Sequence, residues 1–441
     1  SEPDATEDSG RVYGFNLVYS GNHYTSFEVN SFGKTRVVSG INPRSFCFVM
    51  TPGEEFEAPE AIMSFSENGF NALSQNFHRF VKKHILRGYW KEKERPILLN
   101  SWEACYFNIN EDRLVDLATK AASVGIELLV MDDGWFGKRN DDTTSLGDWK
   151  VNPAKLPNGL KTLVDRVKET GVDFGIWVEP EMVSVDSDLY RAHPDWAMQI
   201  PGKPHTQGRN QRILDLSKRE VQDYIIDSLS AIFDSADISY CKWDMNRIFS
   251  DYYSQGVATE RQGELMHRYQ IGLYRCMKVL TEKYPKILFE GCASGGNRYD
   301  LGILSYFPQI WTSDDTDAIM RSGIQTNVSY GYPAASYTCH VSDVPNHQTL
   351  RSTPLETRYN IACFGCLGYE FNLCNMSEEE LQAVREQVAQ YKKLRRLFQY
   401  GEFYRVRHDE RIVQWTVVSE DKEEAVGLFF QKLVLPNDPT K

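Results

Sequence analysis

The pattern of apolar and polar positions divides the chain into three parts. Residues 11–70 alternate with the period of two that is typical of β-strands, for example over residues 12–19 and 45–50. The pattern predicts the end of an antiparallel β domain, which we assign to residues 1–85. A helix over about residues 70–86 is expected at its boundary.

From residue 96 onward, short apolar stretches alternate with amphipathic helices. Helical spacing is clear where Leu265, Tyr269 and Leu273 recur every four residues, and Asn110 is placed to cap an earlier helix. The eight candidate strands cover residues 97–102, 128–133, 174–179, 238–244, 287–292, 310–315, 334–341 and 364–371. This repetition predicts an α/β fold, a (β/α)8 TIM barrel, over residues 86–398. A doubly wound open sheet is the alternative, but no strand is followed by a phosphate-binding glycine motif.

The last part returns to a β pattern. A charged helix is expected over about residues 377–398, followed by strands over residues 412–418 and 425–430. We assign residues 399–441 to the start of a C-terminal antiparallel domain, so that partial β-sandwich-type domains flank the barrel. The chain begins with Ser1 rather than Met, and we expect both ends to be cut from a longer protein.

Composition narrows the possible partners and location. The 441 residues carry a formal net charge of -12, which argues against nucleic acid or an anionic membrane surface as a partner. No run of about 18 apolar residues and no signal peptide is present, which predicts no membrane span. The 9 cysteines show no framework spacing, which predicts a reduced, cytoplasmic chain. Cys363 and Cys366 have zinc-like spacing but no second pair, so no metal or other cofactor is expected.

The predicted strand ends are polar and rich in tryptophan. In a barrel, the carboxyl ends of all eight strands meet at one face, where catalytic residues lie. The polar ends comprise residues 100–103, 132–135, 177–181, 242–244, 290–296 and 311–317. Carboxylates beside indole rings suit a sugar, which offers hydroxyl groups and an apolar ring face.

Two acids on different strands could flank a glycosidic bond. A retaining glycosidase needs one carboxylate as nucleophile and one carboxylic acid about 5–5.5 Å away. Alternation puts Lys242 and Asp244 on the same side of the fourth strand, and the sixth strand ends two positions around the barrel. Simpler interpretations exist: Asp244 could cap a helix, Asp132 and Asp133 could bind a divalent ion, and residues 179–181 could merely close a strand.

The motifs at these strand ends resemble those of the microbial α-galactosidases of glycoside hydrolase family 36. The similarity spans nearly the whole barrel in order, and residues 1–85 resemble the later part of the family's N-terminal domain. The motifs are NSWEA (100–104), MDDGWF (131–136), GDWKVNPAKLPNGL (147–160), WVEPEMVS (177–184), LDLS (214–217), KWDMNR (242–247), CASGG (292–296), TSDDTDA (312–318), VPNHQT (344–349) and TPLETR (353–358).

The resemblance implies a retaining, metal-free, homo-oligomeric hydrolase that removes terminal α-linked galactose, as from melibiose and raffinose. It assigns Asp244 as nucleophile and Asp314 as acid/base, and the negative Asp244 is expected to raise the pKa of Asp314. The substrate-binding residues that it implies are Trp102, Asp132, Asp133, Trp177, Arg209, Lys242, Asn246, Cys292, Gly295 and Trp311.

One position departs from the family pattern, and other functions stay open. Asp315 stands where the family more usually has Asn, which adds a second candidate acid beside Asp314. Alternation allows only one of the two to face the sugar, and we favour Asp314. The alternative functions are an α-N-acetylgalactosaminidase or galactosyl-transferring relative, a metal-dependent barrel lyase using Asp132, Asp133 and Glu179, and a sugar-binding protein without catalysis.

Overall fold

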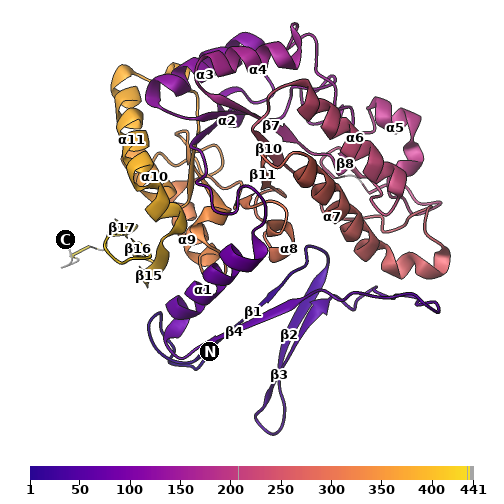
Figure 1. The fold of residues 1–441 in the computed structure, drawn as a ribbon, viewed down its shortest axis with the longest axis horizontal. Coiled ribbons are helices and arrows are strands. Elements are labelled where there is room, and N and C mark those ends of the chain that lie inside the picture. Colours follow the sequence, from indigo (N-terminus) through magenta and orange to yellow (C-terminus); the bar gives the residue numbers. More distant parts are fainter. Residues whose placement is uncertain (207, 435, 438–441) are drawn as a thin grey trace.

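The centre of the molecule is a closed barrel of eight parallel strands surrounded by helices (Figure 1). The computed structural model describes residues 1–206, 208–434 and 436–437. In chain order the barrel strands are β5 (Leu98–Asn100), β6 (Leu128–Met131), β7 (Asp173–Val178), β10 (Tyr240–Trp243), β11 (Leu288–Gly291), β12 (Gln309–Trp311), β13 (Tyr337–Ser342) and β14 (Cys366–Glu370). Each strand pairs in parallel with the next, and β14 closes on β5. The predicted barrel and its eight strands are confirmed.

A helix follows each barrel strand and covers the outside of the barrel. These helices are α3 (Glu111–Val124), α4 (Gly159–Glu169), α6 (Arg219–Ser235), α7 (Leu265–Lys283), α8 (Leu301–Leu304), α9 (Ala318–Val328), α10 (Leu355–Ala362) and α11 (Glu378–Tyr400). Asn110 caps α3 as predicted, because its side chain accepts a hydrogen bond from the N–H of Arg113. Ser377 and Glu380 form a reciprocal capping box at the start of α11.

The barrel interior is layered, and this layering places the polar side chains at one end. A small apolar cluster fills the interior, formed by Leu98, Leu128, Val130, Tyr240 and Leu288. Above it, the Gln309 amide donates to Glu290 Oε2 at 3.1 Å and to Thr338 Oγ1 at 2.9 Å. Residues two further along the strands, such as Lys242 after Tyr240, point into the next layer toward the carboxyl end.

The N-terminal part forms two small antiparallel sheets below the barrel in Figure 1. Strand β1 (Val12–Leu17) pairs with β4 (Ala61–Ser66), and β2 (His23–Val29) pairs with β3 (Thr35–Ile41). The helix predicted from residue 70 is α1 (Gly69–Phe80), which is continued by a π-helical turn, η1 (Val81–Ile85).

The strand predicted over residues 45–50 is wrong. The N–H of Cys47 donates to the Gly263 carbonyl at 3.2 Å, and the N–H of Val49 donates to the Glu264 carboxylate at 2.9 Å. These backbone donors therefore bind the loop before α7 instead of a neighbouring strand. The alternating aromatic residues instead pack around Phe56, whose ring centroid lies 4.7 Å from that of Phe48.

The chain returns to antiparallel structure after α11. Strands β15 (Glu402–His408), β16 (Ile412–Val418) and β17 (Ala425–Gln431) form one three-stranded sheet, which confirms the two predicted strands. The sheet docks on the barrel through the buried Trp415, whose indole N–H donates to Thr326 Oγ1 of α9 at 3.0 Å.

Short elements occupy the loops between the barrel strands and helices. They are α2 (Trp102–Cys105), β8 (Met182–Val183), α5 (Asp188–Ala192), η2 (Pro194–Trp196), β9 (Arg212–Ile213), η3 (Thr259–Glu264), η4 (Ala334–Ser336) and η5 (Leu373–Asn375). In the described parts of the chain, no helix has both the length and the apolar character that crossing a bilayer requires.

Candidate active site

A cavity of about 210 Å³ opens at the carboxyl ends of the barrel strands. This is smaller than the roughly 300–1,000 Å³ of sites for drug-sized ligands, and it suits one sugar ring rather than a whole oligosaccharide. Ten of the twelve predicted site residues line it: Trp102, Asp132, Asp133, Trp177, Arg209, Lys242, Asp244, Asn246, Trp311 and Asp314. The tertiary structure thus brings together residues from strand ends far apart in the sequence.

Asp244 follows β10 and is held in one orientation by three donors. The Trp177 indole N–H donates to Oδ2 at 3.2 Å, and the Asn246 amide donates to the same oxygen at 2.6 Å. The backbone N–H of Met245 donates to Oδ1 at 2.8 Å. The carboxylate is buried but lines the cavity, so it is fixed where a nucleophile would meet a bound substrate.

Asp314 follows β12, two strands from Asp244, and keeps solvent access at the cavity. The Trp311 indole N–H donates to its Oδ1 at 2.9 Å. The surrounding protein raises the pKa of Asp314 from 3.8, first through burial and second through the negative charge of Asp244. The expected direction is confirmed, although burial contributes more than Asp244. A raised pKa favours the protonated form that a general acid needs.

Asp315 is directed into the backbone of its own turn. Its Oδ1 accepts a hydrogen bond from the N–H of Asp317 at 3.1 Å, just before α9. Among the described residues, those lining the cavity include Asp314 and not Asp315. This placement supports Asp314 as the acid/base candidate, as alternation suggested.

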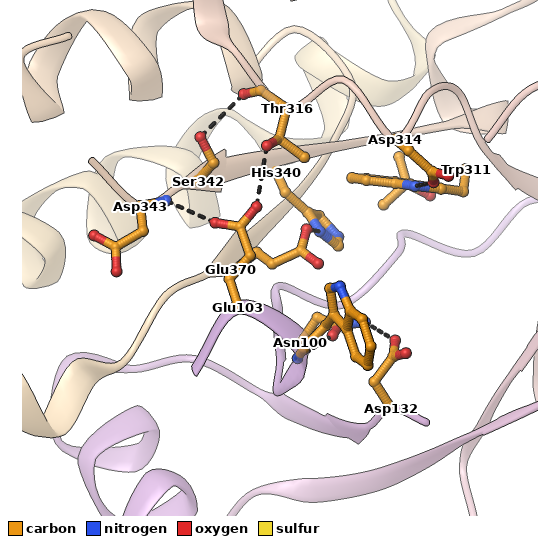
Figure 2. Close-up of polar contacts among 12 residues, drawn as sticks. Asn100, Glu103, Asp132, Trp311, Asp314, Thr316, His340, Ser342, Asp343 and Glu370 are labelled. Atoms are coloured by element: carbon orange, nitrogen blue, oxygen red, sulfur yellow. Dashed lines mark hydrogen bonds and ion pairs between the residues drawn. The ribbon is translucent and has the colours of Figure 1, made fainter. Parts of the chain in front are cut away.

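The two acids after β6 are both paired in the interior. Lys242 Nζ lies 3.0 Å from Asp132 Oδ2. Figure 2 shows that the Asn100 amide also reaches Asp132, where it donates to the same oxygen at 2.8 Å. The Arg139 guanidinium donates hydrogen bonds of 2.8, 3.0 and 3.2 Å to the Asp133 carboxylate. Burial nevertheless raises the pKa of Asp133, with Arg139 opposing that rise.

Replacing Arg139 should therefore destabilise the fold. Arg139→Met leaves Asp133 as an uncompensated buried charge, which we expect to cost roughly 3–5 kcal/mol at pH 7. The cost should be smaller at pH 5, because losing Arg139 raises the folded-state pKa of Asp133 further and stability is lost as pH rises toward it. Denaturant unfolding at both pH values measures the difference.

The exposed pair of Lys161 and Asp165, 2.6 Å apart, provides a control. Lys161→Met should change the unfolding free energy by no more than about 1 kcal/mol, because solvent screens this pair. If both substitutions lower the unfolding free energy by the same amount, the buried pair contributes no more to stability than the exposed one.

The other predicted residues differ in how they reach the cavity. Arg209 is exposed and sits in a loop with a positive φ of 48°. Cys292 is buried beside Asp244. The pKa of its thiol is raised first by burial and second by the negative charge of Asp244. A side chain at Gly295, whose φ is 83°, would come within 2.8 Å of the Asp314 backbone nitrogen. Contact of Cys292 or Gly295 with the sugar stays a prediction. Cys292 lies beside Asp244, and Gly295 lies beside the backbone of Asp314.

Sequence reasoning missed five cavity residues, namely Glu103, Thr316, His347, Gln348 and Glu370. Glu103 lies in the polar strand end 100–103 and Glu370 at the end of β14, so the rule that found Asp132 could have selected both. His347 and Gln348 lie in the VPNHQT motif, but no local pattern gives the path by which this loop after β13 reaches the cavity.

Glu103 binds the loop after β13 and so holds it against the barrel. Its carboxylate accepts from Thr316 Oγ1 at 3.0 Å and from the N–H of Asp343 at 2.9 Å (Figure 2). His347 Nδ1 lies 3.2 Å from the same carboxylate, which raises the pKa of His347.

A second carboxylate supports the tryptophan that binds Asp314. Glu370 Oε2 lies 2.9 Å from His340 Nδ1, and the His340 ring lies 4.4 Å from that of Trp311 (Figure 2). Glu370 thus fixes an imidazole ring against which Trp311 packs. The chain of contacts orients the indole N–H toward Asp314.

The carboxylates that a metal-dependent lyase would use have other partners. Asp132 binds Lys242, Asp133 binds Arg139, and Glu179 accepts from the N–H of Asn246 at 2.6 Å. Within residues 1–206, 208–434 and 436–437, no three His, Cys, Asp or Glu side chains are grouped to hold a metal ion. The donor set therefore does not favour the lyase interpretation.

Comparison with known families and proteins gives consistent matches. The melibiase family profile matches residues 55–401, and that of the glycosyl hydrolase family 36 N-terminal domain matches residues 1–51. α-Galactosidase AgaA of Geobacillus stearothermophilus is 49% identical over 438 residues, which are 99% of this chain and 60% of that protein. α-Galactosidase Mel36A of Lactobacillus acidophilus is 47% identical over 96% of this chain and 58% of its own length.

Solved structures agree with these matches. The crystal structure of AgaA superposes with a TM-score of 0.98 over 99% of this chain and 61% of that one. A variant of AgaA that was solved in complex with raffinose superposes equally well, at 48% identity and with the same coverage. The chain thus spans about three fifths of the length of the relatives that it matches.

Proposed function

Because this chain belongs to glycoside hydrolase family 36, we propose that it is a retaining exo-α-galactosidase that releases terminal α-linked galactose from oligosaccharides. Raffinose, melibiose and related α-galactosides are the proposed substrates. The raffinose and stachyose bound in structures of AgaA variants support this substrate class. We place the activity in the barrel, over residues 86–398, flanked by the end of one β domain and the start of another.

The observation that carries the proposal is the pair of acids from β10 and β12. Asp244 and Asp314 both line the cavity, and the pKa of Asp314 is raised first by burial and second by the negative charge of Asp244. Two such carboxyl groups with different environments are the arrangement that separates a nucleophile from a general acid.

In the proposed mechanism, Asp244 attacks the anomeric carbon while Asp314 gives its proton to the departing oxygen. The bond to the aglycone breaks, and a β-linked galactosyl ester forms on Asp244. This ester removes the negative charge of Asp244, so the pKa of Asp314 falls and the group can act as a base. Asp314 then deprotonates a water molecule that attacks the same carbon, which releases α-galactose and restores both carboxyl groups.

The remaining cavity residues would bind and orient the galactose. Asp132 and Asp133 are proposed to accept hydrogen bonds from the 4- and 6-hydroxyl groups, with Lys242 beside them. Trp177, Trp102 and Trp311 offer apolar ring surface. The small cavity supports cleavage at a chain end, because it suits one ring.

A reducing, cytoplasmic location and a homo-oligomeric state are proposed as well. All nine cysteines are free thiols, and seven of them are buried. Free buried thiols are typical of reducing compartments. The family resemblance supports the oligomer, and a light-scattering mass would test it.

Hydrolysis of p-nitrophenyl α-galactoside by this chain tests the proposal. We expect turnover that EDTA does not affect, with α-galactose as the first sugar product by NMR. The same assay with p-nitrophenyl α-N-acetylgalactosaminide, and with a sugar acceptor present, separates the related specificities. Galactose binding without turnover would instead indicate a sugar-binding protein.

A further inference from the structure

A fully buried carboxyl group, Glu179, lies behind the proposed nucleophile. It follows β7, the strand next to β10, and has no exposed surface. One oxygen, Oε1, accepts from the backbone N–H of Asn246 at 2.6 Å. The other, Oε2, lies 3.2 Å from the Gln211 amide nitrogen. The mechanism above assigns Glu179 no role.

Through Asn246, Glu179 is connected to Asp244. The Asn246 side chain donates to Asp244 Oδ2 at 2.6 Å, and its amide oxygen accepts from Ser294 Oγ at 3.0 Å. Because the Asp244 carboxylate can only accept, the NH2 end of the Asn246 amide is the end that faces it. Because Glu179 holds the Asn246 backbone, it sets the position from which that amide reaches the nucleophile.

The charges around Glu179 favour its neutral form. The negative charges of Asp244 and Asp133 both act on it, and Arg139, the cation that opposes them, is bound to Asp133. Among the described residues, its hydrogen-bonding partners are two uncharged groups, an amide and a backbone N–H. Burial and the charge of Asp244 raise the pKa of Glu179 to about 8.

The neighbouring Glu181 shows the opposite arrangement. It is equally buried, but the Arg298 guanidinium lies 2.8 Å from its Oε1, and Tyr269 and Trp243 also donate to it. The two carboxyl groups at this strand end therefore differ in their donors and in charge pairing. Glu181 forms an ion pair with Arg298, whereas Glu179 is buried beside other acids.

The Gln211 amide can accept a hydrogen bond from the O–H of a neutral Glu179. In the orientation in which its nitrogen faces Glu179, the amide Oε1 is buried without a partner in the described parts of the chain. Amide oxygen and nitrogen are assigned from hydrogen bonding, so the amide can also be placed with a half-turn. After that half-turn, Oε1 faces Glu179 and accepts its O–H.

We propose that Glu179 is a neutral carboxylic acid that positions Asp244 through Asn246 without placing a second negative charge behind the nucleophile. The positioning role rests on the proposed hydrolase function, whereas the protonation state does not. An ionised Glu179 would repel the negative charge of Asp244 and would raise the pKa of Asp314 further. A neutral one supplies the same acceptor for Asn246 without that repulsion.

The kinetic test compares Glu179→Gln with Glu179→Ala. Glutamine copies the shape of the neutral acid and keeps the acceptor for Asn246, so kcat should stay within about twofold of wild type. Alanine leaves the Asn246 N–H unpaired and frees the amide, so kcat should fall by about 100-fold with a smaller change in KM. Loss of activity in Glu179→Gln equal to that in Glu179→Ala would overturn the proposal.

Glu181→Gln is the matched control for charge. It should lower the melting temperature because it removes the anion that Arg298 needs, whereas Glu179→Gln should not. A drop of equal size in both variants would mean that Glu179 is ionised. If Glu179→Ala does not fold, the melting temperatures of the two glutamine variants and the infrared spectrum of Glu179→Gln still test whether Glu179 is neutral.

Two further measurements report the protonation state of Glu179 separately from any effect on folding. The alkaline limb of kcat/KM should be unchanged in Glu179→Gln; a shift to lower pH would show that the wild-type group carried a charge that raised the pKa of Asp314. The infrared difference between wild type and Glu179→Gln at pH 6.5 should show a carboxylic acid C=O band. Absence of that band overturns the proposal even if the wild type proves catalytically inactive, which would separately reject the hydrolase function.

Discussion

Asp244→Ala should lower kcat for p-nitrophenyl α-galactoside by at least about 10⁴-fold, because no covalent intermediate can form without the nucleophile. The fold should tolerate the change, since the substitution removes an acceptor rather than an apolar core side chain. Trp177 and Asn246, which donate to this carboxylate, keep access to cavity water. Initial rates and a thermal melt of the same preparation measure both effects.

Azide gives this prediction its control. In Asp244→Ala, azide can enter the space left by the carboxylate and attack the anomeric carbon from the face that Asp244 would have used. The product should be β-galactosyl azide, with part of the lost rate restored. An α-azide product would contradict the double displacement, and wild-type activity in the variant would remove Asp244 from the mechanism.

The second large effect is expected at Asp314. Asp314→Asn should lower kcat by about 10²–10⁴-fold on raffinose, whose leaving group needs a proton, and far less on p-nitrophenyl α-galactoside in the first step. Asp315→Asn is the matched control, because it changes the adjacent carboxyl group in the same way. Its side chain caps the backbone of Asp317 and should have only a small effect. A larger loss in Asp315→Asn would reverse the assignment of the acid.

The pH profile checks the same residue independently. Catalysis begins with protonated Asp314, so kcat/KM should fall as pH rises through its pKa, which burial and Asp244 raise above 3.8. The alkaline limb should therefore lie above the range of an ordinary aspartic acid, and Asp314→Asn should abolish it. A limb that persists unchanged in Asp314→Asn would assign it to another group.

The barrel was predictable because its signals are local. Each strand is a short apolar run and each helix an apolar period of about 3.6, so the eightfold repetition is visible without any tertiary contact. Alternation along β10 likewise put Lys242 and Asp244 on one side, and both line the cavity. The strand predicted over residues 45–50 was wrong because its structure depends on a distant contact. An alternating pattern cannot show that the N–H groups there bind the loop before α7.

The cavity and its electrostatics were decided by contacts between distant residues. His347 reaches the cavity because Glu103, 244 positions earlier in the sequence, holds its loop, and no period in either segment encodes that contact. Burial, which contributes most to the raised pKa of Asp314, likewise depends on the whole barrel face. Sequence therefore determined which barrel strands exist and which way their side chains point. Tertiary structure decided which side chains share a cavity and which of the buried acids have a cation partner, because desolvation and charge pairing act through space.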